Sequence, residues 1–196
     1  MKYPAIHKIC DASDEIVEGN KNVVATVTDY WKWAHSDLMD NTERGIYAEF
    51  LVAKAVGDSR SHRVNWDKYD VISSEGIRIE VKTSAYLQAW GQDKLSAIRF
   101  NIGKTYGYDD ETNSYDTIKK RQADIYVFCV LNEINQDNLN LLDITQWDFY
   151  VISTKTIDQN PNYKNKTTIS LSPLIELGAI KCEYKDIHDE ILRAFD

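Results

Sequence analysis

The sequence predicts an α/β fold in which a central mixed sheet is flanked by helices. Three observations lead to this prediction. A short pair of β-branched runs around a Ser-Ser-Glu-Gly turn is typical of a hairpin, and a continuous apolar run at 123–131 has the length of a buried strand. Apolar residues at helical spacing precede and follow these strands, at 41–56 and 184–195.

The composition is that of one globular domain spanning residues 1–196. Hydrophobic residues make up 43% and charged residues 28% of the 196 residues. The net charge of −8 argues against a surface covered by phosphate-binding residues, although a local basic patch remains compatible with it. The three cysteines are scattered, which suggests neither a disulfide framework nor a zinc site and favours the cytoplasm. No run approaches the ~18 apolar residues of a membrane helix, so we expect no membrane association.

Residues 1–40 have the pattern of an N-terminal helical extension. Apolar residues recur every three or four positions between Lys21 and Met39, which predicts one helix with a single apolar stripe. Trp31 and Trp33 within this helix are interpreted as packing residues, since aromatics at helical spacing usually fill a core. The alternative is a helix that contacts a partner or DNA.

A second helix is predicted from Asn41 or Thr42, either of which can cap it, to Val56, with Gly57 ending it. Its circumference is apolar nearly all round, so we expect it to be buried on most sides. Glu49 lies within that apolar surface, where an isolated carboxylate is costly. It is expected either to take part in a metal site or to form an ion pair with Arg78 or Lys82.

The hairpin at 69–82 carries the candidate site. If Ser74, Glu75 and Gly76 form a three-residue loop with Gly76 in the left-handed conformation, Asp70 lies opposite Glu80. Alternation then places Asp70, Glu80 and Lys82 on one face, away from the core, and the apolar residues on the other. We therefore predict that the two carboxylates and the ammonium group lie within a few ångströms of one another.

Two carboxylates on paired positions of neighbouring strands repel each other and raise each other's pKa. A divalent cation with hard oxygen ligands, typically Mg²⁺, would relieve this repulsion, and Lys82 would point at the same centre.

Asp70, a gap of nine residues and Glu80-Val81-Lys82 resemble the motif of the PD-(D/E)xK nuclease superfamily, which has the restriction-endonuclease-like fold. Tyr69 replaces the proline of the motif, a position that varies in the superfamily. The resemblance covers 41–154, and leaves 1–40 and the C-terminal strand and helix at 155–196 unconstrained. It also extends to the helix that carries Glu49, which looks like the first helix of that fold.

The resemblance implies a metal-dependent deoxyribonuclease of restriction or repair type that hydrolyses DNA phosphodiester bonds. The implied catalytic residues are Asp70, Glu80, Lys82 and Glu49. Mg²⁺, for which Mn²⁺ can substitute, would be held by Asp70, Glu80, the Val81 carbonyl and Glu49. The resemblance also allows a homodimer, since many enzymes of this fold cut two strands as dimers, although no segment has the pattern of a dedicated dimer helix.

Candidate DNA contacts follow the hairpin. The stretch from Thr83 to Tyr115 is expected to be irregular and mixes cations with aromatics, which suits a sugar-phosphate backbone or a plain solvated loop equally well. The run 119–122 is the densest basic segment and leads into the buried strand. The residues selected as nucleic-acid contacts are Lys104, Lys119, Arg121 and Gln122. The alternative is that the basic run is only a solvated face.

The rest of the chain predicts strands at 147–153 and 167–171, a polar loop at 158–166 and a closing helix at 184–195. The sequence has no phosphate-binding glycine loop, no paired histidines and no GxSxG serine, which disfavours nucleotide-binding, histidine-metal and serine-hydrolase functions.

Three functions therefore remain. They are the nuclease, a catalytically inactive nucleic-acid-binding relative, and an unrelated α/β domain in which Asp70, Glu80 and Lys82 form only a surface ion-pair network.

Overall fold

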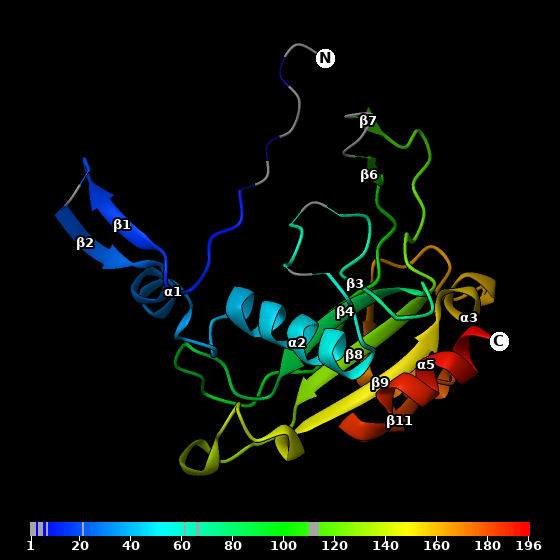
Figure 1. Ribbon diagram of the computed structural model, residues 1–196. Coiled ribbons are helices and arrows are strands. Elements are labelled where there is room, and N and C mark those ends of the chain that lie inside the picture. The colour runs from blue at the N-terminus through cyan, green and yellow to red at the C-terminus, as the bar shows by residue number, and fades with distance from the viewer. Residues whose placement is uncertain are drawn as a thin grey trace.

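The computed structural model describes residues 3, 6, 8–20, 22–60, 62–65, 67–109 and 114–196. Its body is built on a five-stranded sheet in the order β11–β9–β8–β4–β3 (Figure 1). β4 and β8 are parallel and the other neighbours are antiparallel, so the predicted mixed sheet is confirmed. The strands are β3 (Val71–Ile72), β4 (Arg78–Ala85), β8 (Ile125–Leu131), β9 (Trp147–Ser153) and β11 (Ile180–Cys182).

The β3–β4 hairpin has the predicted register. Val71 pairs with Ile79 and Ile72 with Arg78, and the same register continued by one residue sets Asp70 opposite Glu80. Gly76 has a φ of 85°, and the Gly76 amide donates to the Ser73 carbonyl. The three-residue loop is therefore confirmed, and with it the alternation that places Asp70 and Glu80 on one face.

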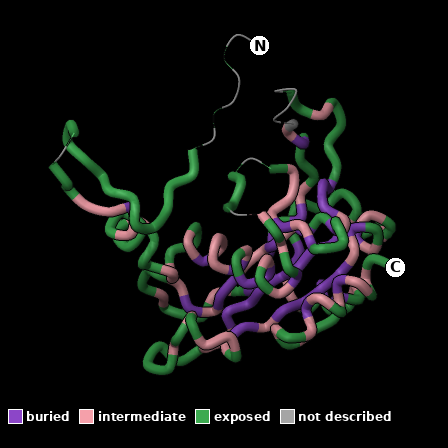
Figure 2. The backbone as a smooth tube through the Cα atoms, viewed as in Figure 1, coloured by how far each residue is buried: buried purple, intermediate pink, exposed green. Residues whose placement is uncertain are grey.

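One face of the sheet packs against two helices, α2 (Asn41–Ala55) and α5 (Ile187–Phe195). Buried residues of this layer include Val52, Ile79, Val127 and Ile191. Figure 2 shows that the buried segments concentrate in the central strands of the body. The odd-numbered residues of β4 and β8 point to this side, as alternation requires. The closing helix predicted at 184–195 is confirmed, with its first turn formed as a 3₁₀ segment at Tyr184–Asp186.

The opposite face is a second core, which corrects the expectation that the charged face of the hairpin points away from the core. Tyr126 and Phe128 on β8 lie beside Glu80 and Lys82 on β4 and are buried. Central strands of a layered α/β fold are covered on both sides, so Glu80 and Lys82 lie at the margin of a packed layer. The covering elements are β5 (Arg99–Asn101), paired with β10 (Thr168–Ser170), and the short helices α3 (Thr154–Gln159) and α4 (Leu171–Glu176).

The N-cap of helix α2 is Asp40, and not Asn41 or Thr42 as predicted. Asp40 accepts from the amides of Thr42 and Glu43, because its carboxylate reaches the free amides of the first turn. The helix is also less buried than expected. Its buried face lies against the sheet, whereas Phe50 is 52% exposed.

The N-terminal extension is not the single helix that we predicted from 21 to 39. It contains a hairpin of β1 (Glu15–Glu18) and β2 (Asn22–Thr26), followed by the shorter helix α1 (Val27–His35). β-branched residues favour the strand, and Gly19, with a φ of 65°, suits the turn. Thr26 and Asp29 then form a capping box that starts α1 at the end of β2.

This N-terminal arm stands to one side of the body (Figure 1). Trp33 is 86% exposed and Trp31 is also exposed, so the interpretation of the two tryptophans as packing residues is wrong. The helical spacing of the apolar residues is present in α1, but among the described residues of this helix only Val27 is buried.

The segment predicted to be irregular contains β5 and a small hairpin of β6 (Tyr108–Asp109) and β7 (Ser114–Tyr115). Two further 3₁₀ segments, Gln136–Asn138 and Ile144–Gln146, connect β8 to β9. Among the described residues, no helix has the length and apolar character needed to cross a membrane.

Gly76→Ala should destabilise the protein by about 1 kcal/mol, because an L-residue is strained in the left-handed region that the loop requires. A Cβ at this position would meet no other atom, so the effect isolates the backbone. The midpoint of denaturant unfolding measures it. Gly91→Ala, which also places its Cβ in open space but has no positive φ, should be as stable as the parent. Equal midpoints for the two variants would show that the loop tolerates alanine.

Candidate functional site

Three charged side chains meet where the start of β3 lies beside β4, at the end of the pair away from the connecting loop. The Lys82 ammonium lies 2.5 Å from a Glu80 carboxylate oxygen and 3.8 Å from Asp70 Oδ2. The Val81 amide donates to Asp70 Oδ2 at 2.8 Å, which ties the aspartate to the strand that carries the other two residues. The predicted convergence of Asp70, Glu80 and Lys82 is therefore present.

The electrostatics of this cluster follow from its partial burial. Burial raises the pKa of Glu80, the nearby Asp70 charge raises it further, and Lys82 acts in the opposite direction. Burial alone would lower the pKa of Lys82, but Glu80 and Asp70 together raise it above its ordinary value. Lys82 is thus a cation that interacts with both carboxylates and offsets part of their negative charge.

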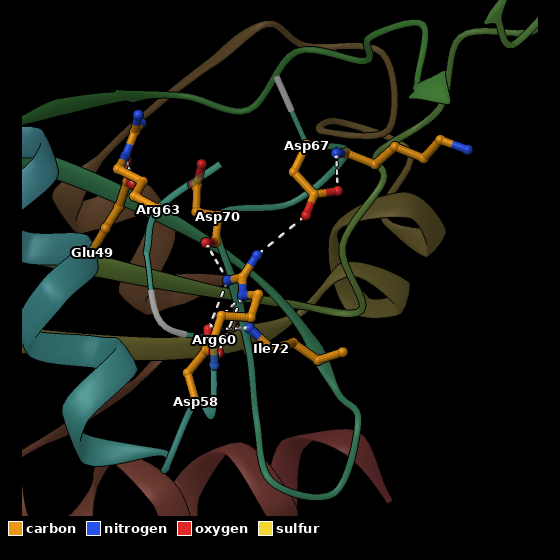
Figure 3. Close-up of polar contacts among 8 residues, drawn as sticks. Glu49, Asp58, Arg60, Arg63, Asp67, Asp70 and Ile72 are labelled. Atoms are coloured by element: carbon orange, nitrogen blue, oxygen red, sulfur yellow. Dashed lines mark hydrogen bonds and ion pairs between the residues drawn. The ribbon is translucent and has the colours of Figure 1, made fainter. Parts of the chain in front are cut away.

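Glu49 reaches the same region from α2, and its partner is Arg63 (Figure 3). Both Nε and Nη2 of Arg63 donate to the Glu49 carboxylate, and Nη1 donates to Asn65. Neither predicted ion-pair partner of Glu49 is used, since Arg78 binds Asp124 and Lys82 binds Glu80. Glu49 is nevertheless close enough to raise the pKa values of both Glu80 and Lys82, so the four residues form one electrostatic cluster.

A second arginine, Arg60, forms hydrogen bonds and ion pairs near the start of β3. Arg60 donates to the Asp58 carboxylate, to Asp67 and to the Asp70 carbonyl, as Figure 3 shows. Asp58 in turn accepts from the Ile72 amide. The backbone that follows the Asp70 side chain is therefore held by the Arg60–Asp58 ion pair, and the Asp70 amide donates to the Ile79 carbonyl of β4.

Arg60 and Arg63 were missed in the sequence analysis. The signal was present, because two arginines lie in the ten residues before Asp70 in an otherwise acidic chain. Their positions depend on how residues 58–70 fold back over α2, and no local period encodes that path.

The donor chemistry of the cluster fits a hard divalent cation. Asp70, Glu80 and Glu49 provide carboxylate oxygens of the kind that Mg²⁺ binds. Among the described residues, however, no three acidic, histidine or cysteine side chains are already arranged around a common metal position. Lys82 and Arg63 neutralise Glu80 and Glu49 instead, so binding of a cation requires these two pairs to rearrange.

The four residues selected as nucleic-acid contacts lie in two environments. Lys104 and Lys119 are exposed, and the Lys119 ammonium lies 5.1 Å from the centre of the Tyr106 ring. Arg121 is buried, with its side chain 0% exposed, and binds Asp158 and four backbone carbonyls. Gln122 is buried as well and donates to the Thr105 carbonyl. The structure thus gives Arg121 and Gln122 internal partners.

Arg121→Ala should lower the free energy of unfolding by about 3 kcal/mol, because it leaves Asp158 and several carbonyls without their donor. Thermal and denaturant unfolding measure the loss. Lys119→Ala, at an exposed position two residues away, should stay within about 0.5 kcal/mol of the parent. A stable Arg121→Ala protein with weakened DNA binding would favour the predicted phosphate contact over the structural role.

Comparison with models of known protein families gives a match. The model of a family described as bacteriophage T4 endonuclease IV matches residues 4–172, which include every residue of the cluster. No curated protein matches the chain.

Proposed function

The chain belongs to the bacteriophage T4 endonuclease IV family, and on this premise we propose that it is a metal-dependent DNA endonuclease of the PD-(D/E)xK type, acting in restriction or repair. The family supports a DNA nuclease. The observation that supports the finer assignment is the convergence of Asp70, Glu80 and Lys82 across the β3–β4 pair, with Glu49 approaching from α2. This is the arrangement that the motif requires.

Hydrolysis of a phosphodiester needs a water that loses a proton, a phosphate whose growing charge is neutralised, and a stabilised leaving oxygen. Asp70, Glu80 and Glu49, with the Val81 carbonyl, would hold Mg²⁺ or Mn²⁺, which lowers the pKa of a bound water and neutralises phosphate charge. The Val81 amide keeps Asp70 directed toward β4. Lys82 orients the attacking water and takes its proton once nearby positive charge has lowered the pKa of its ammonium.

Arg63 has a role in the same proposal. Its guanidinium presents a fork of donors that matches a phosphate as well as a carboxylate. In this structure the Glu49 carboxylate accepts hydrogen bonds from two of these donors. When Glu49 turns to a cation, Arg63 becomes available to a DNA phosphate beside the cluster.

The inactive relative remains as the second candidate, because Glu49 and Glu80 already form ion pairs with Arg63 and Lys82. A nicking assay on supercoiled plasmid, with Mn²⁺ or Mg²⁺ and with EDTA as the control, separates the two. The nuclease should nick with metal and stop with EDTA. Calorimetric binding of Mn²⁺ without nicking would favour the inactive relative, and no uptake of Mn²⁺ would contradict the proposed metal site.

A further inference from the structure

A cavity of about 240 Å³ lies directly beside the carboxylate cluster, between α2 and the segment that precedes β3. Glu49 and Asp70 belong to both the cluster and the wall of the cavity. A group bound in the cavity would therefore touch the same two side chains that are proposed to act on the phosphate. Its volume is below the ~300–1,000 Å³ of sites for drug-sized ligands, which suits a single small ring system.

One wall of the cavity is apolar and belongs to α2. Ile46, Phe50 and Ala53 lie on one side of the helix, at spacings of four and three residues, and Val71 of β3 closes the wall. Phe50 is the large residue of this set. It is half exposed, whereas Leu51 and Val52 of the same helix are buried in the core against the sheet.

The ring of Phe50 is held in place by its neighbours. It stacks on Tyr47 with an interplanar angle of 21°, and the Lys54 ammonium lies 5.5 Å from its centre. Arg63 also lines the cavity, where it is paired with Glu49. An aromatic platform with cations beside it is the combination that binds a base together with its phosphate in single-stranded segments of nucleic acid.

We propose that this cavity is a nucleobase subsite, in which a base next to the bond being cut stacks on Phe50 while its phosphate lies between Arg63 and the carboxylate cluster. The proposal rests on the proposed nuclease function and deepens it. The position of the cut is then set in part by how a base enters the cavity.

The test uses an oligonucleotide with one mapped cleavage bond and a series in which each base flanking that bond is replaced in turn by an abasic tetrahydrofuran residue. For the parent protein, one flanking position should be sensitive, with kcat/KM reduced roughly tenfold or more by loss of the stacked base. Phe50→Ala should reduce kcat/KM on the intact oligonucleotide by a similar factor. When Phe50→Ala is tested on the abasic oligonucleotide, kcat/KM should fall little further than with either change alone, because both changes remove the same stacking contact.

Two variants complete the design. Phe50→Trp keeps an aromatic surface and should retain sensitivity to the abasic residue. Phe195→Ala removes a phenylalanine of matched exposure, 53% against 52%, at the end of α5, and should behave as the parent does. Circular dichroism and the thermal midpoint verify that Phe50→Ala is folded.

Independent, multiplicative effects of Phe50→Ala and of the abasic residue would overturn the subsite, and so would parent-like cleavage by Phe50→Ala. Either result leaves the nuclease function intact, since the parent protein still cleaves. A parent protein that cleaves none of the oligonucleotides or plasmids would instead overturn the proposed function, and the subsite with it.

Discussion

Asp70→Asn should reduce DNA cleavage by about 10³-fold or more, which corresponds to roughly 4 kcal/mol of lost transition-state stabilisation. The substitution removes one of the negative charges proposed to hold the metal ion. It keeps an oxygen that can accept from the Val81 amide, so the start of β3 should stay in place. Initial rates of plasmid nicking and calorimetric titration with Mn²⁺ should both show the loss. Glu80→Ala should have the same two effects.

Asp67→Asn is the control for this prediction. Asp67 lies three residues away and binds Arg60, so its replacement removes a neighbouring negative charge without touching the cluster. It should retain most of the metal uptake and most of the rate. Glu49→Ala should lose less of the metal uptake and of the rate than either Asp70→Asn or Glu80→Ala, since we propose that Glu49 would reach the metal ion directly or through water. Unchanged uptake of Mn²⁺ by both Asp70→Asn and Glu80→Ala would remove these two carboxylates from the metal site.

The Lys82→Ala variant should still bind the metal ion, but its rate of DNA cleavage should fall by roughly 10²- to 10⁴-fold. This is the range expected for loss of a general acid or base. The reason is its position, since the ammonium contacts Glu80 and lies near Asp70 without supplying a carboxylate. Because Lys82 neutralises both carboxylates here, its removal should also tighten uptake of Mn²⁺. Single-turnover cleavage and the Mn²⁺ titration measure the two effects separately.

Lys82→Arg separates charge from proton transfer. Arginine keeps the positive charge but does not release a proton at neutral pH, so a variant that recovers little of the rate would support the proposed transfer of a proton to Lys82. Full recovery would assign Lys82 a purely electrostatic role. Lys94→Ala, outside the cluster, serves as the control and should cleave at the parent rate. If Lys82→Ala cleaves as fast as the parent with Mg²⁺ present, the catalytic assignment is wrong even though the residues converge.

The parts of the fold that sequence reasoning predicted are those set by short-range patterns. The β3–β4 register follows from a three-residue loop and Gly76, and the buried strand β8 follows from its uninterrupted apolar run. The bounds of β9 are those predicted, and the closing helix differs only in its 3₁₀ first turn. In each case the determining residues lie within about a dozen positions of one another.

The N-terminal arm shows the limit of the same reasoning. Apolar residues from Val23 onward fit a helical stripe, but the first of them pair with Glu15–Glu18 across the Gly19 turn instead. A β-branched run is compatible with either structure, and the available partner strand decides between them. The exposure of Trp31 and Trp33 likewise depends on which part of the protein lies opposite α1, and the spacing of apolar residues along the chain does not reveal this.

By itself the sequence determined the centre of the candidate site, because Asp70, Glu80 and Lys82 lie on one hairpin and the alternation of a strand places them together. Only the tertiary structure decided the surroundings of that centre. It paired Glu49 with Arg63, buried Arg121 against Asp158, and joined β5 to β10 across nearly seventy residues to cover the second face. These contacts form between segments distant in the chain, where the packing of layers and the neutralisation of buried charge, rather than local conformational preference, select the partner.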